Sequence, residues 1–190
     1  MERLLKKGGF FIILLFLAIP FSAQATQLNL TVTGFGSPPL RDIYNGNYYT
    51  MSPYYATIDG HPNVPIWCID WDHNANAGNT WTAYVTPLPS APNSYTYLNS
   101  LVSYEKMAWL FDQYPSQTDA DKKAIQWLVW DIAHGSNTHP GYTPTGYNYW
   151  DTQVNAHYAD PGNNYSRWLI FSDVNKTYQE FMVGSVNFIV

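Results

Sequence analysis

Two short stretches decide how this sequence is interpreted: Trp67-Cys68-Ile69-Asp70 and, further along, Ala124-Ile125-Gln126-Trp127-Leu128-Val129-Trp130. Cys68 is the only cysteine of the chain, so no intramolecular disulfide can involve it. A thiolate placed beside a glutamine carboxamide can displace ammonia and form an internal thioester, which joins the carbonyl carbon of Gln126 to the sulfur of Cys68. The two stretches therefore predict the two halves of one reactive site.

In this order, the two stretches resemble the paired signatures of bacterial thioester domains, which occur on secreted and surface adhesins and in related PEP-CTERM-type secreted proteins. In that family an aromatic-Cys-aliphatic-acid segment supplies the cysteine, and an apolar-Gln-x-x-apolar-Trp segment supplies the glutamine. Between them, Lys106-Met107-Ala108-Trp109-Leu110-Phe111 resembles the family's short apolar helix. The resemblance implies a thioester cross-link between Cys68 and Gln126. It also implies a mostly β (α+β) fold, a β-sandwich or barrel-like domain with a small helical insertion.

The N-terminal segment has the pattern of a secretory signal peptide. Three basic residues precede an apolar run over residues 10–21, and Ala23-Gln24-Ala25 offers a small-x-small cleavage pattern. The apolar run is too short for a comfortable membrane span. We therefore expect residues 1–25 to be removed, which leaves residues 26–190 as a single secreted domain without membrane insertion. A free thiol in that oxidising environment needs an explanation.

Charge and composition disfavour several classes of partner. The whole chain has a formal charge of −5 at pH 7, and residues 1–25 carry three basic residues and one acidic residue, so residues 26–190 carry −7. Nucleic acid and anionic membrane surfaces are poor partners at that balance. The chain has no Rossmann or phosphate-binding glycine motif, and its five histidines are scattered along the sequence. We expect no cofactor and no metal ion.

Residues 70–78 superficially resemble a calcium-binding loop, because oxygen-bearing side chains occupy every second position from Asp70 to Asn76. However, Ala75 stands where an EF-hand loop needs glycine, and Trp81 stands where that loop needs a bidentate acid. A polar turn before the next strand is therefore the favoured interpretation.

Alternating polarity and turn residues predict strands at 27–33, one or two within 42–58, and others at 66–71, 81–85, 168–171 and 181–190. Asn45-Gly46-Asn47 is a predicted hairpin turn. On the strand 66–71 alternate residues share a face. Cys68 is therefore expected with Asp70 in a polar crevice, while Trp67 points the other way, toward the core.

Helices are predicted over residues 100–114, with a start at 100 or 103, and over 118–134, where Gly135 provides a left-handed cap. Residues 136–164 predict a long irregular loop rich in Gly, Pro, Asn and Tyr. The aromatic side chains of this loop either cover the core or form a sugar-stacking platform.

A thioester also needs proton transfer during its formation and shelter from water afterwards. Asp70, two residues from the cysteine, is the best candidate for proton transfer, and His73 and His134 are weaker ones. Trp67, Trp127 and Trp130 flank the pair in sequence and are the candidates for shelter.

Together these observations predict a secreted, adhesin-like, surface-binding domain that captures an amine or hydroxyl nucleophile of a protein or glycan. It would act once per molecule, so it is not a turnover enzyme and has no catalytic residues in that sense. The alternative is a non-covalent carbohydrate- or matrix-binding exoprotein that uses exposed aromatics such as Trp150, with Cys68 reduced. A Cys-His-Asn hydrolase is disfavoured, because no oxyanion-type glycine segment surrounds Cys68. Taken alone, Cys68 could be a small buried apolar residue and Gln126 a hydrogen-bonded residue at a helix border.

Overall fold

The computed structural model describes residues 26–184. The predicted signal peptide 1–25 and the last six residues of the strand predicted at 181–190 lie outside the described residues.

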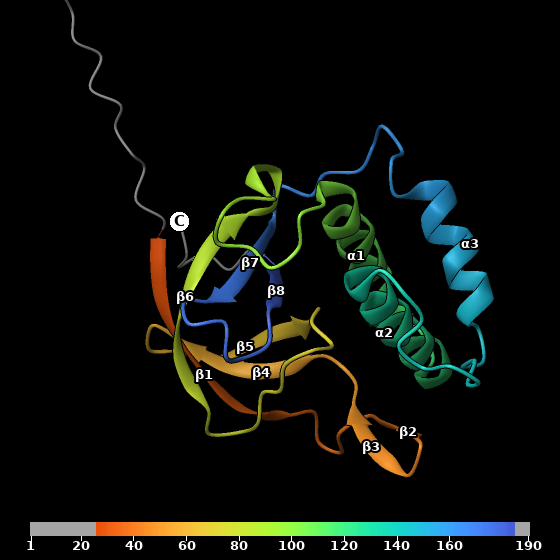
Figure 1. The fold of residues 1–190 in the computed structure, drawn as a ribbon, viewed down its shortest axis with the longest axis horizontal. Helices are drawn as coiled ribbons and strands as arrows, with labels where there is room; N and C mark the ends of the chain where they lie inside the picture. The colour runs from red at the N-terminus through yellow and green to blue at the C-terminus, as the bar shows by residue number, and fades with distance from the viewer. Residues whose placement is uncertain (1–25, 185–190) are drawn as a thin grey trace, which may run out of the picture.

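Within the described residues, six strands close into an antiparallel barrel with the order β1-β4-β5-β8-β7-β6 (Figure 1). Their bounds are Thr26–Phe35 (β1), Tyr54–Ile58 (β4), His61–Cys68 (β5), Thr80–Pro87 (β6), Trp168–Asp173 (β7) and Phe181–Gly184 (β8). The mostly β (α+β) fold class is confirmed. Of the two predicted architectures, the barrel is the one that forms.

The strands β2 (Arg41–Tyr44) and β3 (Asn47–Thr50) form a separate hairpin that projects beside the barrel (Figure 1). Asn45 and Gly46 connect them with φ angles of 49° and 77°. Two successive positive φ angles are typical of a type I′ turn, whose twist suits a two-residue hairpin. The predicted turn is confirmed.

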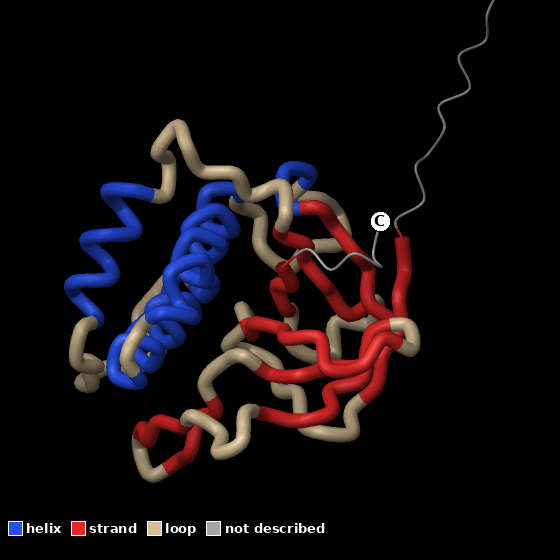
Figure 2. The backbone as a smooth tube through the Cα atoms, turned by 180° about the vertical axis from the view of Figure 1, so that it is seen from behind, coloured by secondary structure: helices blue, strands red, loops and turns tan. Residues whose placement is uncertain are grey.

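The helices α1 (Leu101–Gln113), α2 (Asp119–His134) and α3 (Tyr147–His157) lie together on one side of the barrel (Figures 1 and 2). Short 3₁₀ turns occur at Leu88–Ser90 and Tyr114–Ser116. The side chain of Ser100 caps α1 by accepting from the Ser103 amide, and the side chain of Thr118 caps α2 by accepting from the Asp121 amide. Gly135 ends α2 at φ 73°. Both predicted helices are confirmed.

The prediction of an irregular loop over 136–164 is wrong over residues 147–157, which form α3. Its N-cap residue, Gly146, provides no side-chain cap, so the sequence lacks the usual signal for a helix start. Trp150 and Val154, one turn apart, are buried against the other helices. Trp150 is only 5% exposed and donates from Nε1 to the Asp121 carboxylate at 3.0 Å. Its ring therefore belongs to the core and offers no exposed platform for a sugar.

The buried side chains form two clusters. The barrel core fills the barrel interior, and the interlayer core lies between the barrel and the helices. Helix α2 contributes to both: Ile125 and Leu128 lie in the interlayer core, whereas Trp127 and Trp130 reach into the barrel core. Gln126 lies on the same buried stretch of α2, so its position along the helix is fixed by packing on both sides.

Candidate functional site

Cys68 is the last residue of β5, and its side chain lies in the barrel core. It is 0% exposed and pairs across the sheet with Phe181 of β8. The expected polar crevice around Cys68 is therefore wrong. The strand β5 ends at Cys68. The alternation of side chains along a strand therefore does not extend to Asp70, and Asp70 does not share a strand face with Cys68.

Gln126 meets Cys68, although 58 residues separate them. The Gln126 side chain is 0% exposed, and its Nε2 donates to the carbonyl oxygen of Cys68 at 2.9 Å. Its Oε1 accepts from the backbone amide of Ser52 at 3.3 Å. The structure thus brings the two predicted residues together in one buried place. If the sulfur attacks the carboxamide carbon of Gln126, negative charge develops on Oε1, and the Ser52 amide already donates a hydrogen bond to that oxygen.

Ser52 holds both partners and was not predicted from the sequence. Its Oγ accepts from the Cys68 amide at 2.9 Å, while its own amide donates to Gln126. The Tyr114 hydroxyl donates to the Ser52 carbonyl oxygen. Ser52 is only 1% exposed, so three elements distant in sequence converge on one buried residue. A lone serine ahead of a proline carries no sequence signal that would have revealed this role.

The thiol of Cys68 has two polar contacts. Its Sγ donates to the carbonyl oxygen of Asp70 at 3.3 Å, and Nε1 of Trp130 donates to Sγ at 3.4 Å. Burial raises the pKa of the Cys68 thiol to about 12, and the hydrogen bond from Trp130 opposes that rise. The sulfur is thus protonated at neutral pH, and it must lose its proton as it attacks.

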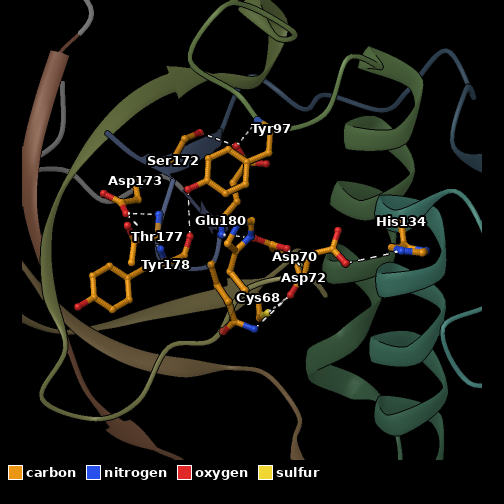
Figure 3. A network of polar contacts seen from close by, with 12 residues as sticks. Cys68, Asp70, Asp72, Tyr97, His134, Ser172, Asp173, Thr177, Tyr178 and Glu180 are labelled. Carbon is orange, nitrogen blue, oxygen red and sulfur yellow. Dashed lines mark hydrogen bonds and ion pairs between the residues drawn. The ribbon is translucent and has the colours of Figure 1, made fainter. Parts of the chain in front are cut away.

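The carboxylate of Asp70 does not serve the thiol directly. It pairs with Nδ1 of His73 at 2.7 Å and accepts from the amides of Asp72 at 2.8 Å and Glu180 at 3.3 Å. Figure 3 shows Asp70 between Cys68 and Glu180, with Asp72 reaching toward His134. Only the Asp70 main chain touches the sulfur. The predicted proton-transfer role of its side chain stays a prediction.

Glu180 is the centre of a hydrogen-bond network next to Asp70. This role was not predicted from the sequence. It accepts from the Tyr104 hydroxyl at 2.7 Å, from the Tyr97 amide at 2.9 Å and from the Ser172 hydroxyl (Figure 3). Burial raises the pKa of Glu180 to about 7, although these hydrogen bonds lower it. Its carbonyl oxygen accepts from the Ile69 amide at 3.1 Å, which fixes the chain immediately after Cys68.

Four rings, which we call the aromatic cover, lie over the buried pair: Tyr49, Trp71, Trp127 and Trp130. Tyr49 and Trp71 are stacked at 5.2 Å with an interplanar angle of 18°, and Trp71 lies 5.3 Å from Trp130. Trp130 in turn contacts the sulfur. This arrangement is consistent with the predicted sheltering role of Trp127 and Trp130, which are 0% and 3% exposed.

Trp67 lies elsewhere. Its ring packs against Phe111 at 5.9 Å and Trp168 at 5.4 Å, at the edge of the interlayer core. Because Trp67 and Cys68 are neighbours on a strand, they face opposite sides of the sheet. Trp67 therefore covers the helix side of β5 and contributes nothing to the aromatic cover.

Two pockets meet at Asp70. The aromatic pocket, of about 590 Å³, is lined by Asp70, by six aromatic residues and by several neutral polar ones. The histidine pocket, of about 270 Å³, includes Asp70, Asp72, His73, His134, Lys176 and Glu180. The aromatic pocket also includes Trp130 and Tyr54, so it lies one side chain away from the sulfur.

Two further features concern metals and membranes. No group of three or more His, Cys, Asp and Glu side chains that could hold a metal ion occurs within residues 26–184. None of the helices in that part of the chain is long and apolar enough to cross a membrane.

No protein-family model and no curated protein sequence matches this chain. Among solved structures, the chain is similar to the N-terminal thioester domain of a surface protein from Clostridium perfringens, with a TM-score of 0.48 and 8% sequence identity. The alignment covers 83% of this chain and 98% of that domain.

Proposed function

We propose that this domain binds a surface covalently through an internal thioester between Cys68 and Gln126. The observation that carries the proposal is the buried contact between the two residues, in which Gln126 donates to the Cys68 carbonyl oxygen and accepts from the Ser52 amide. Because Gln126 and Cys68 are both 0% exposed, a thioester between them would be sheltered from hydrolysis. We also propose an extracellular location, supported by the signal-like pattern of residues 1–25.

The thioester forms with release of one molecule of ammonia. The sulfur of Cys68 attacks the carboxamide carbon of Gln126, the C–N bond breaks, and the thiol proton leaves with the amide nitrogen as ammonia. The Ser52 amide stabilises the developing oxyanion. The Asp70 carbonyl oxygen accepts the thiol hydrogen bond in the resting state, which orients the S–H group. No external oxidant or cofactor enters this step.

In the capture step, the thioester reacts with a nucleophile of the target surface. An amine or hydroxyl attacks the thioester carbonyl, the C–S bond breaks, and the nucleophile's proton passes to the sulfur. The acyl group of Gln126 then joins the domain to its target through an amide or ester bond. The high pKa that burial gives Cys68 makes the returning sulfur take up that proton readily. The domain is used once, which fits a binding role.

Intact mass spectrometry of the secreted protein tests the proposal. We expect a mass one ammonia below that of the chain without residues 1–25, followed by addition of methylamine at Gln126 and appearance of one free thiol. Cys68→Ala is expected to show the full mass and no methylamine addition. Gln153→Ala, a half-buried glutamine of α3, is the matched control and should behave as wild type.

A folded protein with its full mass and a titratable thiol would contradict the proposal. Near-UV circular dichroism distinguishes that result from misfolding, since the packed tryptophans of the aromatic cover give a signal only in the folded state.

A further inference from the structure

The aromatic pocket has a chemical character that narrows the choice of ligand. Tyr48, from β3, is 70% exposed at its rim, and the stacked pair of Tyr49 and Trp71 forms one wall. Trp130, also part of the lining, donates to the Cys68 sulfur at 3.4 Å. Flat, partly exposed rings that also carry a polar group suit a ligand with one apolar face and a polar edge.

The remaining lining is mostly neutral and hydrogen-bonding. Side-chain amides come from Asn47, Asn74, Asn76 and Gln179. Each amide offers both donors and an acceptor. This mixture matches hydroxyl groups, which also donate and accept, better than it matches aliphatic or ionic groups.

The charges in the pocket lining disfavour a lysine side chain as the preferred ligand. The acidic residue of this lining is Asp70, and its carboxylate is already paired with His73 and two backbone amides. Arg41 adds a positive charge to the same lining. An ammonium group would find little attraction here, and it must also lose its proton before it can attack. A hydroxyl group has neither cost.

Gln179 supplies a second, independent indication of a ligand. It is only 7% exposed, and its Nε2 donates to the same Asp70 carbonyl oxygen that accepts from the Cys68 thiol. Its Oε1 is buried and has no hydrogen-bond partner within residues 26–184. A buried acceptor without a donor is costly. Because Gln179 is part of the pocket lining, a small rotation of its side chain would present Oε1 to an O–H group that enters beside Trp130.

We propose that the aromatic pocket is a receptor site for a neutral glycan, which packs a sugar ring against the wall formed by Tyr49 and Trp71, contacts Tyr48 at the rim and presents a hydroxyl beside Gln179 to the thioester. The covalent step rests on the proposed function above. In it, the glycan oxygen bonds to the Gln126 carbonyl carbon, the C–S bond breaks, and the hydroxyl proton passes to the Cys68 sulfur. The product is an ester and a free thiol.

The test separates recognition from the covalent step. Binding to an array of immobilised neutral glycans (mannan, cellulose, dextran and chitin fragments), polygalacturonate and a lysine-rich peptide is measured with the Cys68→Ala protein, which cannot form the bond. We expect retention on at least one neutral glycan and none on polygalacturonate or the peptide. Adding Tyr48→Ala should weaken that retention on the order of tenfold.

Tyr149→Ala is the matched control, because Tyr149 is also an exposed tyrosine, at 58%, but lies on α3 and outside this pocket. It should bind as the Cys68→Ala protein does. Equal losses in Tyr48→Ala and Tyr149→Ala, or no retention on any neutral glycan, would overturn the proposal.

The two proposals fail separately. Glycan retention without methylamine addition to the wild-type protein leaves the receptor site standing and removes covalent capture. Methylamine addition without glycan retention, or with retention on the lysine-rich peptide alone, leaves covalent capture standing and removes the glycan.

Discussion

The two pockets that share Asp70 differ in chemistry. The aromatic pocket adjoins the sulfur through Trp130 and holds mainly rings and amides, whereas the histidine pocket gathers Asp72, His73, His134 and Lys176 on the far side of Asp70. The side of Asp70 that adjoins Trp130 and the sulfur thus offers mainly neutral groups, whereas the histidine pocket holds most of the ionisable side chains around Asp70. In the proposed function, the aromatic side shelters the acyl carbon of the thioester from water, and Asp70 connects the sulfur to the histidine pocket through its carbonyl oxygen and its contact with His73.

The largest effect is expected when the ring that lies between the aromatic pocket and the sulfur is removed. Trp130→Ala should lower the free energy of unfolding by about 3–5 kcal/mol, because it deletes a buried aromatic side chain. It should also speed hydrolysis of the thioester by admitting water. Urea unfolding and the time course of free-thiol appearance measure the two effects. Trp130→Phe, which keeps a ring but removes the contact to Sγ, should retain most of the stability. An unchanged thiol time course in Trp130→Ala would contradict the shielding role.

The stability of the protein is expected to depend on pH through Glu180, which lines the histidine pocket. The pKa of Glu180 is raised from 4.5 to about 7 in the fold. Between these pH values the unfolded chain gives up its proton while the folded chain keeps it, so stability falls as pH rises through this window and is level above it. The fall is on the order of 3 kcal/mol.

Glu180→Gln should remove this slope in urea unfolding measured below, within and above the window. Asp173, buried on β7 and bonded to the amides of Thr177 and Tyr178, offers Asp173→Asn as a control that leaves the slope in place. A wild-type slope that survives in Glu180→Gln would assign it to another group.

A substitution in the aromatic cover that leaves Trp130 in place is expected to have a smaller effect, on the rate of methylamine addition. Trp71→Ala removes half of the stack with Tyr49, so we expect methylamine to react several times faster while the total amount added stays at one per chain. The rate is followed by intact mass. A slower reaction would mean that Trp71 positions the nucleophile more than it excludes water.

The smallest effect is expected in the histidine pocket. His134→Ala removes an exposed ring whose Nε2 lies 3.6 Å from an exposed Asp72 carboxylate. Such pairs contribute little, so unfolding should change by less than about 0.5 kcal/mol. The methylamine rate should stay within about twofold of wild type if the two pockets act separately. A large loss of rate would show that protons reach the thioester from this side.

The sequence carries local signals well, and these predicted much of the fold. The Asn45-Gly46 turn, the capped helix ending at Gly135 and the strands near 27–33, 81–85 and 168–171 agree with the prediction, because each depends on residues close together in the chain. The prediction of one or two strands within 42–58 is wrong, since three form there, and the strand predicted at 66–71 runs instead over His61–Cys68. Helix α3 was missed, since its start has no capping side chain and its burial depends on the other two helices.

At the candidate site too, residues with a local sequence signal were predicted, whereas residues that act through long-range contacts were not. Cys68 and Gln126 could be paired because both carry recognisable chemistry, and the structure does bring them together. Ser52, Glu180 and Gln179 were missed, because each acts through contacts with residues far away in sequence and none belongs to a pattern. The direction of the Cys68 side chain was predicted incorrectly, since it depends on where β5 ends.

The attachment of Cys68 to β8 has a consequence for when the bond is made. Cys68 pairs with Phe181, and the Ile69 amide is held by Glu180, both close to the end of the described chain. Gln126 donates to the Cys68 carbonyl oxygen, and this contact forms only when α2 has docked on a barrel that β8 has closed. We therefore expect the thioester to mature last, after synthesis of nearly the whole domain. Nascent chains arrested before β8 should still release a full-mass fragment with a free thiol, and an early loss of ammonia in such fragments would disprove this order of events.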